Sequence, residues 1–287
     1  MNVYLDNAAS TPVHKEVLEA MLPYLSTNYG NPSAIHSNGK RNKAAIEFSR
    51  KTIAKYLNCK AQEIIFCSSG TEANNMALKL AVENLGVKHI ITSAIEHKSV
   101  LNIVLYLEEA KGIKVSYVDV NKDGTIDIDS LESILKDNND NTLVSIMHAQ
   151  NELGSINDID KIGKLSKKYG TLFHTDTVQT IAHLPFNLKE SNIDFLSASA
   201  HKFHGPLGSG FLYKNDKIKI GTWLHGGGHE RNVRSSTENI SGIVGMSTAL
   251  KMAYDNFETD KAKVLELKNY FKQELKKNIP DVVFNEA

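Results

Sequence analysis

The stretch Ser197-Ala-Ser-Ala-His-Lys-Phe-His-Gly-Pro-Leu-Gly-Ser-Gly210 follows an apolar run, Ile193–Leu196, with small residues, one lysine and a glycine-rich exit. This pattern predicts a buried strand that presents Lys202 at its end. A lysine among small residues, beside His201, is the kind that forms a Schiff base with an aldehyde cofactor. A lone lysine is more often an ordinary surface residue, so this interpretation depends on a second segment. The residues expected to leave room for the ligand are Gly205, Gly208 and Gly210.

The second segment, Gly170–Gln179, is an apolar strand that ends at Asp176, with an amide side chain, Gln179, three positions later. Open α/β sheets bind their ligands at strand ends. Pyridoxal phosphate requires a lysine for its aldehyde and an acidic partner that keeps its ring nitrogen protonated. Asp176 and Lys202 fit these two roles, so the two segments together predict a pyridoxal phosphate site.

A third segment has the features of a phosphate site. Glu63–Gly70 predicts a strand followed by a turn, and Thr71–Leu85 has apolar residues suited to a helix. A serine, glycine and threonine turn at a helix start offers free backbone N–H groups and the positive end of the helix dipole to an anion. The alternative is that Thr71 only caps the helix, with Glu72 favouring the dipole.

The Asp-x-x-Gln and Ser-x-His-Lys motifs resemble those of cysteine desulfurases of the NifS/IscS type. These enzymes are a branch of the class V aminotransferase-like, fold-type-I pyridoxal phosphate enzymes. Six further motifs resemble the signatures of that family, and they occur in the family's order. They are Leu5–Pro12, Tyr29–Ser33 with His36, Ser68–Glu72, Glu96–His97, Gln150–Gly154, and Gly226–Arg231 followed by Arg234–Asn239.

The resemblance implies a role for each matching residue. Lys202 would form the Schiff base, Asp176 would pair with the pyridine nitrogen, and Gln179 would hydrogen-bond the phenolic oxygen of the cofactor. His97 would stack on the ring and handle protons, while Asn151 would lie near the phenolic oxygen and the substrate carboxylate. The residues implied at the phosphate are Gly70, Thr71, Ser199 and His201, together with Thr237 from the neighbouring subunit of a homodimer.

The implied activity is the conversion of L-cysteine to L-alanine, with the sulfur held by the enzyme as a persulfide. An iron-sulfur scaffold or a tRNA-thiolation acceptor protein would receive that sulfur. Two other interpretations stay open: a selenocysteine lyase or another class V enzyme, and a non-catalytic cofactor-binding homologue that dimerises with a complete paralogue.

Family members continue beyond the length of this chain with a catalytic-cysteine loop and an arginine that binds the substrate carboxylate. The two cysteines here, Cys59 and Cys67, both precede Lys202 and are interpreted as small buried residues. We therefore expect a C-terminally truncated chain, with Ile279–Ala287 forming the start of a strand. A fragment, an incomplete sequence or a naturally short homologue would each explain this.

Composition is consistent with a cytoplasmic enzyme. The 33 basic and 33 acidic residues cancel, which gives no electrostatic reason to expect a nucleic-acid partner. Two cysteines argue against a disulfide framework and favour a reducing compartment. No apolar run reaches membrane-spanning length.

Apolar strands alternate with longer amphipathic stretches, which predicts an α/β fold with a mostly parallel sheet covered by helices. The resemblance makes this the pyridoxal phosphate-dependent transferase fold type I, with an incomplete small α/β domain. It implies small-domain residues at 1–13, a large cofactor-binding domain at 14–252 and the start of the small domain at 253–287. The expected strands are Lys88–Ser93, Lys114–Val118, Thr142–Met147, Leu172–Asp176, Phe195–Ser199 and Gly210–Tyr213.

Two patterns resemble metal sites without meeting their requirements. Asp119–Asp127 copies half of a calcium-binding loop, but the closing acidic position is Ser130 and a strand precedes it, so we expect a turn. The paired histidines lie among glycines without further ligands at suitable spacing, so we expect no metal. The charged stretch Asp255–Lys277 predicts a solvated amphipathic helix.

Overall fold

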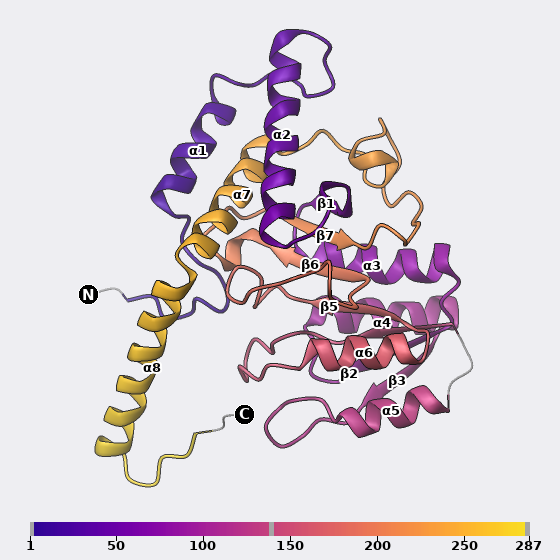
Figure 1. Cartoon of the computed structure of the whole chain (residues 1–287), viewed down its shortest axis with the longest axis vertical. Coiled ribbons are helices and arrows are strands. Elements are labelled where there is room, and N and C mark those ends of the chain that lie inside the picture. The colour runs from indigo at the N-terminus through magenta and orange to yellow at the C-terminus, as the bar shows by residue number, and fades with distance from the viewer. Residues whose placement is uncertain (1–2, 138–140, 285–287) are drawn as a thin grey trace.

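A seven-stranded sheet lies at the centre of the computed structural model, which describes residues 3–137 and 141–284 (Figure 1). The strand order is β1-β7-β6-β5-β4-β2-β3, and only β7 runs antiparallel to its neighbours β1 and β6. The predicted α/β fold with a mostly parallel sheet is confirmed. The strands are β1 Ile64–Cys67, β2 His89–Ser93, β3 Lys114–Val118, β4 Thr142–Ser145, β5 Leu172–Asp176, β6 Phe195–Ser199 and β7 Gly210–Lys214.

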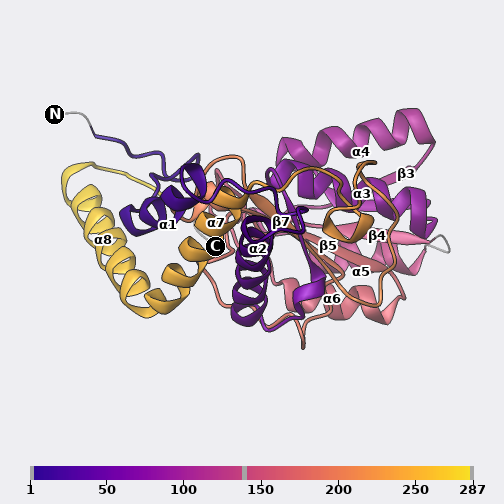
Figure 2. The same cartoon turned by 90° about the horizontal axis from the view of Figure 1, so that it is seen from above.

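Helices cover both faces of the sheet, as Figure 2 shows for α3 and α4 on one side and α5 and α6 on the other. Helix α3 (Gly70–Leu85) and α4 (Lys98–Lys111) share one apolar core cluster with the sheet. The second cluster includes α2 (Ser37–Tyr56), α5 (Ile128–Lys136), α6 (Ile159–Lys168) and α7 (Ile240–Asp255). Strands β1, β2, β4 and β6 are buried along their whole length, as expected for strands covered by helices on both faces of a sheet.

The chain reverses its direction across the sheet after β3. It runs outward from β2 to β3 through α4, and then returns through α5 to place β4 on the other side of β2. Because parallel crossovers are right-handed, this reversal moves the connecting helices from one face of the sheet to the other. The loops that follow β2 and β4 therefore diverge, which leaves a crevice at the carboxyl ends of these two strands.

The segment resembling a calcium loop is a turn, as predicted. Val120 and Ile126 form an antiparallel bridge across it. Asp127 then caps α5, because its side chain accepts hydrogen bonds from the backbone N–H groups of Asp129 and Ser130.

Helix α8 (Phe257–Asn278) extends away from the rest of the molecule in Figure 1. The helix predicted at 255–277 is confirmed. Its apolar side chains are not packed in a core, since no residue of α8 is buried. Residues 279–284 form a bend and a turn and no strand, so the strand start expected from residue 279 is wrong for those six residues, and 285–287 lie outside the described residues. The boundary predicted after residue 252 falls in the last turns of α7 and stays a prediction. None of the helices described has the length and apolarity needed to cross a lipid bilayer.

A buried ion pair fastens the loop before α7 to the sheet. The guanidinium of Arg50 donates to both carboxylate oxygens of Glu230, at 2.7 and 2.8 Å, and to the carbonyl of Ile64 at 2.7 Å. The backbone N–H of Phe66 also donates to Glu230, at 2.9 Å. Residues 230–232 all adopt left-handed backbone angles, which cost roughly 1 kcal/mol each in non-glycine residues. The pair and its neighbouring hydrogen bonds connect helix α2, strand β1 and the loop to one another.

We predict that Arg50→Met destabilises the protein by about 3–5 kcal/mol, because it leaves the Glu230 carboxylate buried without its partner. Urea denaturation measures the change. The matched control is Lys168→Met, which removes an exposed partner of Glu132 and should leave the unfolding midpoint unchanged. Equal midpoints for the two variants would show that the buried pair contributes nothing to folding.

Candidate active site

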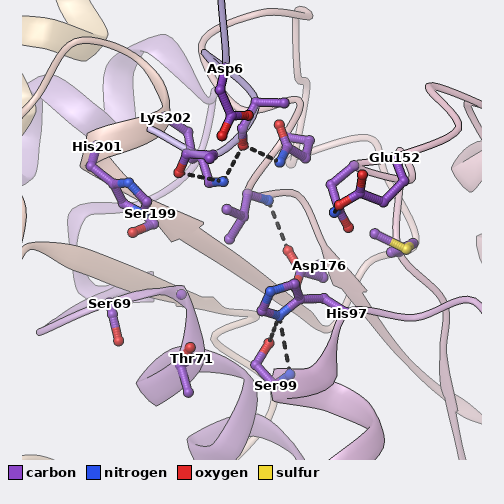
Figure 3. A pocket seen from close by; sticks show the side chains of 17 residues that line it. Asp6, Ser69, Thr71, His97, Ser99, Glu152, Asp176, Ser199, His201 and Lys202 are labelled. Carbon is purple, nitrogen blue, oxygen red and sulfur yellow. Dashed lines mark hydrogen bonds between the residues drawn. The ribbon is translucent and has the colours of Figure 1, made fainter. Parts of the chain in front are cut away.

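The carboxyl ends of five strands meet around one cavity of about 540 Å³ (Figure 3). The turns after β1, β2, β4, β5 and β6 all contribute residues to its lining. The structure thus brings together every predicted site residue except Thr237, which is exposed and lies outside the cavity. The predicted residues that line it are Gly70, Thr71, His97, Asn151, Asp176, Gln179, Ser199, His201 and Lys202.

Lys202 enters the cavity from the short 3-10 helix that follows β6. Its ammonium group donates to the backbone carbonyl oxygens of Ala8 and Ala9, the latter at 3.0 Å. Partial burial lowers the pKa of Lys202, and the negative charges of Asp176, Asp6 and Glu152 offset part of that effect. A lowered pKa increases the fraction of free amine, which is the form that attacks an aldehyde.

Asp176 is 5% exposed and forms one wall of the cavity. Its Oδ1 accepts a hydrogen bond from the backbone N–H of Val178 at 2.9 Å, and its Oδ2 accepts one from Asn74 Nδ2 at 2.7 Å. Burial raises the pKa of Asp176, while these two donors and the charges of His97 and Lys202 lower it. Neither His97 nor Lys202 hydrogen-bonds to the carboxylate, so a ligand that brings a positively charged N–H group would supply the missing partner.

The N-terminus of α3 forms the opposite side of the cavity in Figure 3, where Ser69 and Thr71 are labelled. Ser69 is the N-cap, since its Oγ accepts from the N–H of Glu72 at 3.2 Å. The alternative that Thr71 caps the helix is therefore wrong. Gly70 and Thr71 lie in the first turn, where their N–H groups have no intrahelical acceptor. Together with the Ser199 hydroxyl and His201, they offer donors to an anion.

The glycines expected to leave room for a ligand do not line the cavity. A Cβ on Gly210 would lie 2.6 Å from the carbonyl oxygen of Ala198 and 2.8 Å from the backbone of Ser69, so this glycine allows β7 to approach α3. Gly205 and Gly208 are also absent from the lining, so the prediction for all three is wrong. The glycine that matters at the cavity is Gly70, where a Cβ would meet Val178 at 2.4 Å.

Sequence reasoning missed the part played by the N-terminal segment. Asp6, Ala8 and Ala9 line the cavity, and the carbonyl of Ala8 accepts from Gln179 Nε2 at 3.0 Å. The segment is held there because the N–H of Thr11 donates to the carbonyl of His201 at 2.9 Å. The motif at residues 5–12 was the available signal, but a motif does not reveal which backbone oxygens face a site 190 residues away.

Glu96 lies under the cavity floor and is 5% exposed. Its Oε1 accepts from the Ser93 hydroxyl and from the N–H of Met147, both at 2.9 Å, while Oε2 has no partner within the described part of the chain. Burial raises the pKa of Glu96 from 4.5 to about 8, and the charge of Asp176 adds to the rise. This carboxyl group is therefore largely protonated at neutral pH.

Neither thiol of the chain lines the cavity, and both lie in environments that suppress reactivity. Burial raises the pKa of Cys59 to about 12 and raises that of Cys67 further. The sequence-based interpretation of both as buried residues holds for Cys67, whereas Cys59 is partly exposed. Within the described ranges, no three His, Cys, Asp or Glu side chains gather into a possible metal site.

This architecture, with a lysine and a buried aspartate at the carboxyl ends of neighbouring strands, is the transferase fold type I of pyridoxal phosphate enzymes. The chain belongs to the aminotransferase class-V family, whose profile matches residues 3–287. It is 46% identical over 286 residues to "Cysteine desulfurase IscS" of Dictyoglomus turgidum, covering 99% of this chain and 72% of that protein. A relative with the same name in Methanosarcina thermophila is 46% identical over 269 residues, covering 93% of this chain and 66% of the relative.

Solved structures agree with this assignment. A structure described as "NifS-like protein" superposes with a TM-score of 0.92 at 39% identity, covering 96% of this chain and 76% of the other. A second structure, "SspA in complex with cysteine", gives a TM-score of 0.82 at 39% identity, covering 87% and 72%. The chain thus spans about 70% of the length of the relatives it matches.

The raised pKa of Glu96 predicts a pH-dependent stability. Between pH 4.5 and about 8 the folded protein keeps a proton that the unfolded chain has released, so stability falls as the pH rises. Glu96→Gln keeps the acceptor oxygen and removes the charge. It should therefore be more stable than the parent at pH 8 and equal to it near pH 4.5, as measured by urea unfolding. Glu266→Gln, at an exposed position, is the control, and an equal gain there would contradict the assignment.

The raised pKa values of the two thiols predict slow alkylation of the native protein. A pKa of about 12 in place of 9.0 leaves Cys59 with roughly a thousandfold less thiolate at neutral pH. Iodoacetamide should accordingly modify both cysteines at least a hundredfold more slowly in the native protein than in urea, followed by intact mass. Rapid labelling of the native protein would show that one of the thiols is accessible and reactive.

Proposed function

We propose that this protein is a pyridoxal phosphate-dependent cysteine desulfurase that converts L-cysteine to L-alanine and transfers the sulfur to a thiol. The observation that carries the proposal is the convergence of Lys202, Asp176 and the N-terminus of α3 on one cavity. The names of the relatives support the choice of substrate, since two are called cysteine desulfurase and one related structure is described as a complex with cysteine.

The donor set of the cavity fits pyridoxal phosphate. The free N–H groups of α3 with Thr71, Ser199 and His201 would hold its phosphate, and Asp176 would hold its protonated ring nitrogen. Lys202 would bind its aldehyde carbon, and Gln179 would donate to its phenolic oxygen. When bound, the cofactor supplies an electron sink for the substrate carbon atoms.

The chain's own residues would then move protons and orient the substrate. As a free amine, Lys202 would lie near the carbonyls of Ala8 and Ala9, which would stabilise its protonated form. His97, at the start of α4, would exchange protons with the substrate from its Nε2, which has no partner among the described residues. Asn151 would orient the substrate carboxylate through its amide.

Persulfide formation requires a thiolate at the cavity. Cys59 and Cys67 do not line it and their pKa values are raised, so we propose that another thiol accepts the sulfur. An iron-sulfur scaffold or a tRNA-thiolation protein would be the final acceptor. We also propose that the protein acts in the cytoplasm as a homodimer. In this dimer the exposed Thr237 would reach the cavity of the neighbouring subunit. The large domain would comprise residues 14–252.

The proposal is tested with the purified 287-residue chain loaded with pyridoxal phosphate. Borohydride reduction should leave a pyridoxyl adduct on the peptide that contains Lys202, and Lys202→Ala should abolish the adduct. With a small thiol added as sulfur acceptor, the parent should form alanine and sulfide from L-cysteine, and Lys202→Ala should lower the rate at least a hundredfold. Lys217→Ala, which alters an exposed lysine, is the matched control.

Three results would overturn the proposal. An adduct on another lysine would contradict the role of Lys202. Release of a keto acid in place of sulfide would assign the chain to a transaminase. Turnover of selenocysteine without turnover of cysteine would indicate a selenocysteine lyase.

A further inference from the structure

Two polar residues that sequence reasoning missed connect Asp176 to His97. The amide nitrogen of Asn74 lies 2.7 Å from Asp176 Oδ2 and 2.9 Å from Ser99 Oγ. Ser99 Oγ lies 2.8 Å from His97 Nδ1, and the backbone nitrogen of Ser99 lies 3.1 Å from the same ring atom. Figure 3 shows the last two hydrogen bonds of this series, between Ser99 and the His97 ring beside Asp176.

The Asp176 carboxylate determines the direction of the two hydrogen bonds made by the Asn74 amide. Asn74 is fully buried, and its Oδ1 has no hydrogen-bond partner in residues 3–137 and 141–284. Rotating the amide by 180° would place that oxygen against Asp176 Oδ2, where two acceptors would repel each other. The NH₂ group therefore faces Asp176 and Ser99, and its two hydrogens satisfy both acceptors. Ser99 Oγ thus accepts from Asn74, which leaves its own hydrogen for His97.

The last two contacts determine where His97 carries its proton. The backbone N–H of Ser99 points at Nδ1, because His97 is the N-cap of α4. A hydrogen on Nδ1 would collide with this donor, so Nδ1 accepts from both the N–H and the hydroxyl of Ser99. The neutral imidazole then has its proton on Nε2, the nitrogen with no partner among the described residues.

We propose that Asn74 and Ser99 are positioning residues that hold His97 as its Nε2–H tautomer and link its orientation to the Asp176 carboxylate. The tautomer follows from hydrogen bonds within this chain, while the use of that proton in a reaction rests on the proposed function. The arrangement presents an N–H donor of His97 to the cavity. It also connects Asp176, which would bind a protonated ring nitrogen, to His97, which would exchange protons.

The tautomer is measured by long-range ¹H–¹⁵N NMR on the cofactor-free chain with ¹⁵N-labelled histidine, at alkaline pH where imidazoles are neutral. His97→Gln assigns the signals. The parent should show an unprotonated Nδ1 and a protonated Nε2. In Ser99→Ala, which keeps the backbone donor, the Nδ1 resonance should move toward the position of a nitrogen with fewer hydrogen bonds. Ser99→Thr should restore it. Ser247→Ala, whose hydroxyl donates to the carbonyl of Val244, should leave it unchanged.

Asn74→Leu tests the link to Asp176. It should shift the His97 resonances in the same direction as Ser99→Ala, since the serine hydroxyl loses the donor that orients it. It should also weaken pyridoxal phosphate binding about tenfold, because the carboxylate loses one of two stabilising donors. The Asn74→Leu and Ser99→Ala effects on the His97 resonances should be non-additive in the double variant.

The two proposals fail separately. A proton on Nδ1 of His97 in the parent, or resonances unmoved by both Ser99→Ala and Asn74→Leu, would overturn the positioning role whatever the protein catalyses. Equal shifts in Ser247→Ala would overturn it as well. The Nε2–H tautomer in a chain that neither attaches pyridoxal phosphate nor consumes L-cysteine would uphold the positioning role and overturn the proposed function alone.

Discussion

The parallel direction of β2, β4, β5 and β6 is the constraint on which the rest of the structure depends. Parallel strands present all their carboxyl ends at one edge of the sheet, so segments far apart in the sequence end beside one another. The reversal of the chain after β3 then separates the loops that follow β2 and β4. The cavity is the consequence, and His97, Asn151, Asp176 and Lys202 each enter it from a different strand.

Burial gives the cavity its chemical character. Two carboxyl groups, Asp176 and Glu96, lie in its wall and under its floor with raised pKa values. Only Asp176 has hydrogen bonds to both oxygens, which favour its charged form against the cost of burial. Burial likewise favours the neutral form of Lys202, which is the free amine, and lowers its pKa. The site thus combines a carboxyl group that has no cationic hydrogen-bond partner among the described residues with a lysine suited to nucleophilic attack.

Two other glutamates hold the elements around the cavity together. Glu230 pairs with Arg50 in the core, and Glu72 accepts from Arg234 at 2.6 Å and from the Ser68 hydroxyl at 2.7 Å. Glu72 lies one residue after Thr71, so its contacts fix the first turn of α3, where we propose that the phosphate binds. The same contacts hold the loop that leads to the exposed Thr237. The contacts of Glu72 therefore connect the first turn of α3 to the loop before Thr237, which we propose meets a second subunit.

The sequence by itself determined the strands, the helices expected at 71–85 and 255–277, and part of the cavity lining. Apolar runs buried on both faces and small residues at strand ends are local signals, and nine of the ten predicted site residues line one cavity. Tertiary structure alone decided which glycine lines the cavity and which carbonyls accept from Lys202. It also decided the link from Asp176 through Asn74 to His97. These features depend on distances between residues remote in the sequence, and a local pattern contains no information about such distances.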